Sequence, residues 1–318
     1  MITSLFSPEI AEPTKVPKGM LSSALQSYQR DLQTGLVLLE MQNQPPYTLF
    51  FVRGNLATVY RGEGDVERLD ERSWLQSLDS RNEIASLRTL SLTHQDLRIF
   101  KILIEQSSTK DFFSNGSPEL GKLFPLWRQQ ELPALAVIRW PSAEALVLLP
   151  GHGAFERYSI MLTSNTISHF AGSVREILDW KEPYKQAGLI SSASRSLAWQ
   201  EYLLHSAFSK LVQVLLEKAA TLIGRVELNQ IMREVNFKAA ASDWNLSING
   251  TRITDQTFPA NISLEAEMYA TLLGILYQQL ESFIGDSVLR FIQLEALHSL
   301  NPAEDQVIKE YLPVALME

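Results

Sequence analysis

The order of apolar and polar residues divides the chain into two regions with different periodicities. Up to about residue 165, short apolar runs alternate with turns rich in Gly, Pro and Asn, which is typical of β-strands joined by tight connections. Beyond that point, apolar positions recur every three or four residues, which is typical of amphipathic helices. We therefore predict an α+β fold: an extended arm over residues 1–19, a mixed α/β domain over 20–165 with antiparallel strand meanders, and a mainly helical domain over 166–318 with a small hairpin.

Two groups of three predicted strands in the first region have similar spacing. In each group the first strand leads into a proline-containing turn, the second ends in glycine and the third alternates apolar and polar residues. Such a pattern arises from a duplicated unit, but two unrelated meanders also resemble each other at this level, so both interpretations stay open. The strands are predicted over residues 34–41, 47–54 and 55–62, and over 134–140, 144–151 and 154–162.

Two helix starts are marked by capping residues. Thr93 precedes a predicted helix over 94–106 that carries Asp96 in its first turn, where a carboxylate favours the helix N-terminus. Near the end of the chain, Asn301 is followed by proline and then by Glu304, which is the order expected of an N-cap, a first helical proline and a capping-box acid. Both patterns predict the helix boundary to within a residue or two.

The second region is predicted to begin with a hinge and a long helix. The segment 179–188 contains charge and a proline but no apolar periodicity, so we expect the hinge there. The helix predicted over 194–223 is apolar on two faces, which indicates burial between two neighbours. A domain core is the favoured interpretation, and a seam between two copies of the chain is the alternative.

Composition and charge exclude several classes of function. The chain of 318 residues has a formal net charge of −8, which argues against non-specific nucleic-acid binding because that depends on clustered Lys and Arg. It contains no cysteine, which excludes disulfides, thiolate nucleophiles and cysteine-ligated metals. No apolar run reaches the ~18 residues of a membrane-spanning helix, and the first residues do not resemble a secretory signal. We expect a cytoplasmic protein.

The search for catalytic motifs favours no enzyme class. The five histidines have no metal-binding spacing, and neither a phosphate-binding loop nor a nucleophile elbow occurs. His205 is predicted to have a structural role on a helix, whereas His152 lies between two glycines and is the best candidate for chemistry. A small-ligand sensor is an alternative, with a pocket formed by Phe50, Trp140 and His152. No cofactor or metal is predicted.

The stretch YTLFFVRGNLATVYRGEG, residues 47–64, predicts a hairpin that turns at Gly54-Asn55. One face of its alternating pattern belongs to a core. The other face mixes Arg, Asn and aromatic residues, a composition suited to contact with another protein. The predicted partner-binding residues are Phe51, Arg53, Asn55, Tyr60 and Arg61.

The strand that carries Thr34, Gly35, Val37 and Leu39 is followed by an aromatic strand that ends at Gly54. In this pattern residues 20–80 resemble the PatA N-terminal-like (PATAN) family of bacterial signalling domains. The resemblance implies a non-catalytic regulatory role, often beside a phosphoacceptor receiver domain, although this chain shows no receiver motif of its own. The resemblance lies in a T-G-x-L-x-L strand that is paired with an aromatic strand ending in glycine. The matching positions are Thr34, Gly35, Val37, Leu39, Leu49, Phe50, Phe51, Gly54, Leu56 and Tyr60.

The function expected from these observations is that of a cytoplasmic bacterial signalling adaptor that works through protein–protein contacts. Its partners would be proteins, with two-component signalling proteins among the candidates, and a homodimer through the long C-terminal helices is a further expectation. The alternatives are the ligand sensor and, less favoured, an enzyme with a site around His152. Exposed apolar patches on the long helices would support the adaptor.

Overall fold

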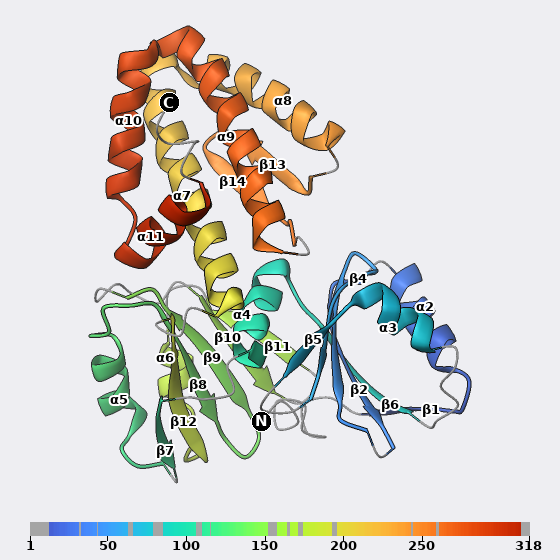
Figure 1. Cartoon of the computed structure of the whole chain (residues 1–318). Coiled ribbons are helices and arrows are strands. Elements are labelled where there is room, and N and C mark those ends of the chain that lie inside the picture. The colour runs from blue at the N-terminus through green and yellow to red at the C-terminus, as the bar shows by residue number, and fades with distance from the viewer. Residues whose placement is uncertain are drawn as a thin grey trace. The chain divides into compact units, whose positions relative to one another are not determined.

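The computed structural model describes residues 13–312, except for 32, 43, 63–65, 79–84, 106–109, 115, 152–157, 164–165, 171–173, 193–195, 243 and 259–260. The chain divides into two compact units, Met1–Ala198 and Trp199–Glu318, which we call unit 1 and unit 2. Unit 1 contains two six-stranded sheets, and unit 2 contains helices and one two-stranded hairpin (Figure 1). The predicted α+β class, with antiparallel strands first and helices second, is confirmed.

Both sheets of unit 1 are antiparallel throughout. The first has the strand order β1-β6-β2-β3-β4-β5, and the second has the order β11-β10-β9-β8-β12-β7. The strands of the first sheet are β1 (Thr14–Val16), β2 (Gly35–Met41), β3 (Tyr47–Val52), β4 (Asn55–Arg61), β5 (Glu67–Leu69) and β6 (Ala85–Ser91). Those of the second are β7 (Lys110–Ser114), β8 (Ala134–Arg139), β9 (Glu144–Leu149), β10 (Tyr158–Thr163), β11 (Thr166–Phe170) and β12 (Gln186–Ser191).

The two sheets are built by the same sequence of elements. Each begins with a strand and a helix, continues with four strands, and ends with a helix, a strand and a helix. If β7 is matched to β1, β8 to β2 and so on, the strand order of the second sheet equals that of the first. The similarity of the two predicted meanders is therefore a repeat of topology. The helices are α2 (Leu21–Arg30), α3 (Glu71–Leu78) and α4 (His94–Glu105), then α5 (Leu120–Trp127), α6 (Arg175–Leu178) and α7 (Leu197–Ile223).

A glycine at corresponding turns of the two sheets makes the same close approach. Gly54, between β3 and β4, has a φ of 76°, and a Cβ there would lie 2.2 Å from the Gln29 carbonyl oxygen in the last turn of α2. Gly151, which follows β9, has a φ of 84°, and its Cβ would lie 2.7 Å from the Glu131 carbonyl oxygen, just after α5. No side chain fits either position, so the repeat extends to the backbone contact between hairpin and helix.

Each sheet buries both of its faces. One face of the first sheet packs on α2 and α3, and one face of the second packs on α5 and α6. Side chains that point the other way, such as Leu36 and Phe50 in the first sheet and Leu135 and Leu146 in the second, are also fully buried. Figure 1 shows α4 between the two sheets, and its residues 96–104 are all buried. Strands covered on both sides are apolar along their whole length, which explains the continuous apolar runs of the sequence.

Unit 1 extends further along the chain than the sequence indicates. The predicted domain boundary near residue 165 is too early, because β12 lies between β8 and β7 in the second sheet. The predicted hinge at 179–188 is packed structure as well. Tyr184 in that segment is 3% exposed, and its hydroxyl donates a hydrogen bond of 2.5 Å to the Pro118 carbonyl. Part of the expected arm over 1–19 forms β1, which pairs with β6.

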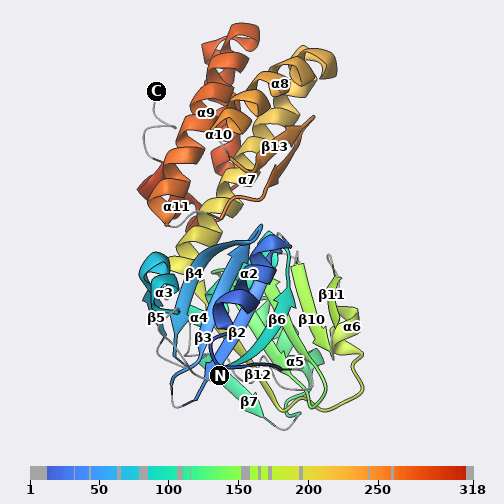
Figure 2. The same ribbon diagram turned by 90° about the vertical axis from the view of Figure 1, so that its right-hand side faces the viewer.

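Unit 2 is a group of helices that run alongside one another, with a small hairpin beside them (Figure 2). After α7 come α8 (Arg225–Ala241), β13 (Leu246–Asn249), β14 (Arg252–Asp255), α9 (Ile262–Ile284), α10 (Asp286–His298) and α11 (Pro302–Tyr311). The two apolar faces predicted for the long helix are buried along most of α7, where Leu204, Phe208, Val212 and Leu216 are fully covered. Leu222, in its last turn, is instead 56% exposed.

Candidate functional site

The β3–β4 hairpin turns at Arg53-Gly54, one residue earlier than the sequence predicts. Val52 pairs with Asn55, and the two turn residues have φ values of 50° and 76°, which corresponds to a type I′ turn. The Arg53 N–H donates to Thr34 Oγ1 at 3.0 Å, and the Gly54 N–H donates to the Gln33 carbonyl at 2.9 Å. The turn is therefore bound to the segment that precedes β2.

Two of the five predicted partner-binding residues are not accessible. Phe51 is 1% exposed, and its ring centroid lies 4.9 Å from that of Tyr28 on α2. Tyr60 is 2% exposed, and its hydroxyl donates to Glu105 Oε1 at 2.6 Å. The prediction that both rings contribute to an exposed face is wrong, because helices cover both faces of the sheet. Arg53, Asn55 and Arg61 are exposed, and Arg61 forms an ion pair with Glu67.

The residues proposed for a ligand pocket do not come together. Phe50 is fully buried in the first sheet, with its ring centroid 5.7 Å from that of Tyr60. Trp140 belongs to the core of the second sheet, under α5 and α6, where its ring centroid lies 5.9 Å from that of Trp180. His152 lies outside the described residues. The described part of this trio offers no shared site.

A carboxylate that the sequence does not point to connects three elements of unit 1. Glu105, the last residue of α4, accepts the Tyr60 hydroxyl on Oε1 and the Ala198 N–H at 2.8 Å on Oε2. The contact with Ala198 satisfies an N–H in the first turn of α7, where a negative charge is favoured. Because its partners lie far away in sequence, no local pattern could have revealed this role.

A buried ion pair lies on the second sheet. Arg139 Nε donates to Glu144 Oε1 at 3.1 Å across the β8–β9 pair, and the Glu144 side chain is 2% exposed. Burial raises the pKa of Glu144 to about 7, although the charge and the hydrogen bond of Arg139 act in the opposite direction. Glu144 can therefore take up or release a proton near neutral pH, but it faces a protein core.

A polar cluster in unit 2 joins α7, β14 and α9. The Tyr269 hydroxyl lies 2.5 Å from Asp255 Oδ2 and 2.9 Å from Glu265 Oε1. His205 Nδ1 lies 2.9 Å from the same hydroxyl and 3.0 Å from Asp255 Oδ2. The Tyr269 ring also stacks on Phe208, with 3.8 Å between the centroids. The predicted structural role of His205 agrees with this arrangement, which fixes the hairpin to two helices.

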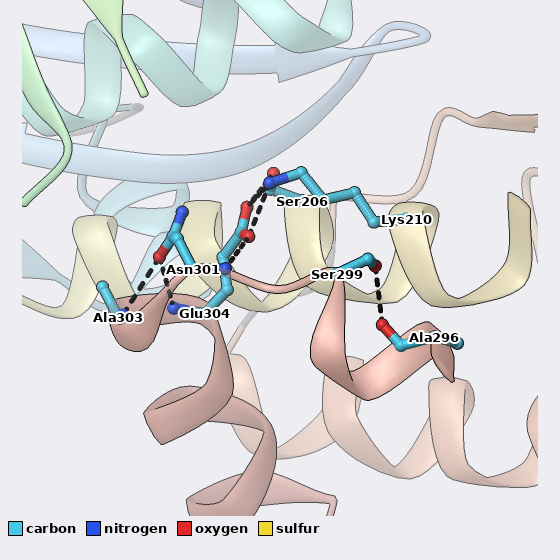
Figure 3. A network of polar contacts seen from close by, with 7 residues as sticks. All are labelled: Ser206, Lys210, Ala296, Ser299, Asn301, Ala303 and Glu304. Atoms are coloured by element: carbon cyan, nitrogen blue, oxygen red, sulfur yellow. Dashed lines mark hydrogen bonds and ion pairs between the residues drawn. The ribbon is translucent and has the colours of Figure 1, made fainter. Parts of the chain in front are cut away.

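Figure 3 shows a second network, centred on Glu304 in the first turn of α11. Its carboxylate accepts the Asn301 N–H at 3.1 Å, while Asn301 Oδ1 accepts the N–H groups of Ala303 and Glu304. The predicted capping box is confirmed. The same carboxylate binds Lys210 Nζ at 2.5 Å and accepts the Ser206 hydroxyl at 2.8 Å, so it also fixes α11 to α7. The Glu304 side chain is 3% exposed, which is consistent with a structural contact.

The exposed surface of unit 2 carries an unusual number of large apolar side chains. On α10, Val288 is 42%, Phe291 62% and Leu294 56% exposed, while Leu289 and Ile292 of the same helix are buried. The helix is thus apolar on a covered face and on an open one. That second stripe, at positions i, i+3 and i+6, is visible in the sequence and could have identified the surface.

The exposed residue Leu222 of α7 continues this stripe. Lys218 Nζ and Glu295 Oε2 lie 3.0 Å apart and join α7 to α10, which run in opposite directions (Figure 1). Leu222 is one turn after Lys218 and Phe291 is one turn before Glu295, so the two side chains lie at the same level of neighbouring helices. We call Leu222, Val288, Phe291 and Leu294 the α7–α10 face. Two further exposed residues lie close to this face in sequence. Val226, at the start of α8, comes soon after Leu222, and Phe283, at the end of α9, comes shortly before Val288.

The comparisons with known proteins do not assign a function. No protein-family model, no curated protein and no solved structure matches the chain. Within the part of the chain that the structure describes, no group of three or more His, Asp or Glu side chains is arranged to hold a metal ion. Among the same residues, no helix is sufficiently long and apolar to cross a membrane. Function must therefore be argued from the surfaces.

Proposed function

We propose that the protein is a non-catalytic regulatory adaptor of the bacterial cytoplasm and acts by binding other proteins. The observation that carries this proposal is the α7–α10 face, where four large apolar side chains are between 42% and 62% exposed. A contiguous apolar patch is costly to leave in water, and in folded proteins it commonly marks an interaction site. Charged residues border the patch, as expected for the polar rim of a protein interface.

The exposed apolar residues are concentrated in unit 2. Among the described residues, the large apolar side chains exposed in unit 1 are Met20, Leu126, Leu132 and Leu178, whereas those of unit 2 are Leu222, Val226, Phe237, Leu264, Phe283, Val288, Phe291 and Leu294. In unit 1 both sheets are covered on both faces, so that unit presents mainly polar surface. The helical unit is therefore the better candidate for the contact, and the hairpin tip at Arg53, Asn55 and Arg61 is a secondary one.

A place in bacterial signalling is proposed from the resemblance of residues 20–80 alone. One of its motif positions has a clear structural reason here. A Cβ at Gly35 would lie 2.0 Å from the Leu90 carbonyl oxygen, so only glycine allows β2 to approach β6. This reason concerns the architecture and does not identify a partner.

Capture of partners from an extract of the native cells tests the proposal. Tagged wild type is compared with Phe291→Asp and with a matched control, Leu126→Asp, because Leu126 on α5 is exposed to a similar extent, 57%. We expect wild type and the control to retain the same partners and Phe291→Asp to lose them. Circular dichroism melting would check that both variants fold as wild type does.

Two results would contradict the assignment of the contact to the α7–α10 face. If the two Asp variants bind the same proteins as wild type, the α7–α10 face is not the contact surface. If an Arg53→Glu variant loses a partner that Phe291→Asp keeps, the contact lies on the hairpin tip, where Arg53 is exposed.

A further inference from the structure

We propose that the α7–α10 face binds a second copy of the same chain, with the two α10 helices antiparallel and Phe291 close to the two-fold axis. This inference rests on the proposed function, because it takes the face to be a protein-contact surface, and it names the first partner of that surface. Three properties of the face favour a second copy over an unrelated protein.

The first property is the spacing of the apolar residues. Val288 and Leu294 lie three residues before and three residues after Phe291. When the helix is reversed about Phe291, Val288 takes the position of Leu294 and Leu294 that of Val288. A two-fold interface needs this self-complementarity, since the contact of residue i with residue j is repeated as the contact of j with i.

The second property is the charge beside the stripe. Arg290 Nε lies 2.8 Å from Asp286 Oδ1, and Lys218 pairs with Glu295, so the bordering charges are neutralised within one chain. The chain as a whole carries a formal charge of −8, so two copies repel each other at long range. Each of these two ion pairs is neutral, so among the described residues they bring no net charge against a second copy and offer none to a strongly acidic or basic partner.

The third property is the area that the face offers. Its four side chains, Leu222, Val288, Phe291 and Leu294, are 42–62% exposed. Side chains of this size and exposure offer on the order of 400 Å² per copy, about half of the ~800 Å² that each partner contributes to a standard interface. We therefore expect a weak dimer that dissociates on dilution rather than a permanent one.

Single cysteines test this geometry, because the chain contains no other cysteine. Purified full-length Phe291→Cys is oxidised with copper–phenanthroline, with Leu126→Cys as the equally exposed control. We expect Phe291→Cys to form a covalent dimer at least tenfold faster than the control. A mixture of Val288→Cys and Leu294→Cys chains should crosslink faster than either chain alone, which reports the antiparallel arrangement.

Sedimentation equilibrium of the purified chain between about 1 and 200 μM gives the affinity. We expect Phe291→Asp to weaken association at least tenfold and Leu126→Asp to leave it unchanged. Wild type that stays monomeric throughout this range, or equal crosslinking at positions 126 and 291, would overturn the homodimer. In that case a partner captured from extract through Phe291 would still support the proposed function. A dimer without captured partners would instead sustain the homodimer and contradict the adaptor role.

Discussion

At the scale of single residues, several polar groups in or near the cores are satisfied by contacts between segments far apart in sequence. Glu105 accepts an O–H from Tyr60 of β4 and an N–H from Ala198 at the start of α7. Tyr269 and Asp255 connect the hairpin of unit 2 to a helix. None of these groups lies in a local motif. Their role is to hold one element in a fixed position against the next.

Glu144 makes the stability of unit 1 depend on pH in a defined direction. Its pKa is raised by burial from 4.5 to about 7, so the folded chain holds a proton there that the unfolded chain has released. The stabilisation from this group is complete below pH ~4.5 and is lost as the pH rises through about 7. In Glu144→Gln the side chain stays neutral and still accepts a hydrogen bond from Arg139.

We expect the difference in free energy of unfolding, Glu144→Gln minus wild type, to be larger at pH 8 than at pH 5 by about 2 kcal/mol. Urea unfolding at the two pH values measures this. Glu119→Gln, whose side chain is 78% exposed, is the control and should show almost no change in that difference. A Glu144→Gln difference as small as that of the control would mean that Glu144 does not hold the proton.

At the scale of elements, Glu304 combines a cap with a contact between helices. Its carboxylate closes the capping box of α11 and binds Lys210 of α7, while Asp305, in the same turn, pairs with Lys309 on the surface. Both acids lie at the N-terminus of one helix and interact similarly with its dipole. The difference between the losses in free energy of unfolding when each acid is neutralised therefore measures the contact with α7.

We expect Glu304→Gln to lower the free energy of unfolding by about 2 kcal/mol, because Lys210 loses the partner of a largely buried ion pair. Asp305→Asn should cost at most about 0.5 kcal/mol, as is usual for an exposed pair. Urea unfolding of the wild-type chain and of both variants measures these free energies. Equal effects would show that only the helix dipole matters and that the contact with Lys210 contributes little.

The elements also show what the sequence can and cannot predict. The strands β2, β3 and β4, the cap at Thr93 and the capping box at Asn301 were predictable because apolar runs and short-range caps are local signals. The box at Asn301 forms, and Thr93 exchanges hydrogen bonds with Asp96. The strands β1, β5, β7, β11 and β12 were missed: β1 and β5 have three residues each, β5 and β7 contain charged residues, and β12 overlaps the segment predicted as a hinge. Their strand character comes from pairing with a neighbour in the sheet.

The candidate site was predictable only in part. Aromatic residues in a hairpin suggested a contact face, but the second face of the first sheet is covered too, so Phe51 and Tyr60 are buried. No local sequence pattern predicts that this second face is buried by α4, a helix more than 30 residues away. By contrast, the open stripe of α10 follows helical periodicity. Its exposure could be predicted once the other stripe of the helix was known to be buried.

At the scale of the whole molecule, each unit has a distinct role in the proposal. Unit 1 repeats one topology twice and encloses apolar residues on both faces of each sheet, which leaves little apolar surface for contacts. Unit 2 buries one face of α10 and leaves the other open. The open apolar face of α10 is the observation on which the proposed contact with another protein rests.

A photo-crosslinking amino acid incorporated at position 291 in living bacterial cells tests this central claim most directly, with the same group at position 126 as the control. We expect a covalent protein adduct at 291 and none at 126, because the proposal places the protein contact at 291 and not at 126. An adduct at twice the mass of the chain identifies the second copy, and any other mass identifies a different partner. Equal labelling at the two positions, or no adduct at 291, would contradict the account.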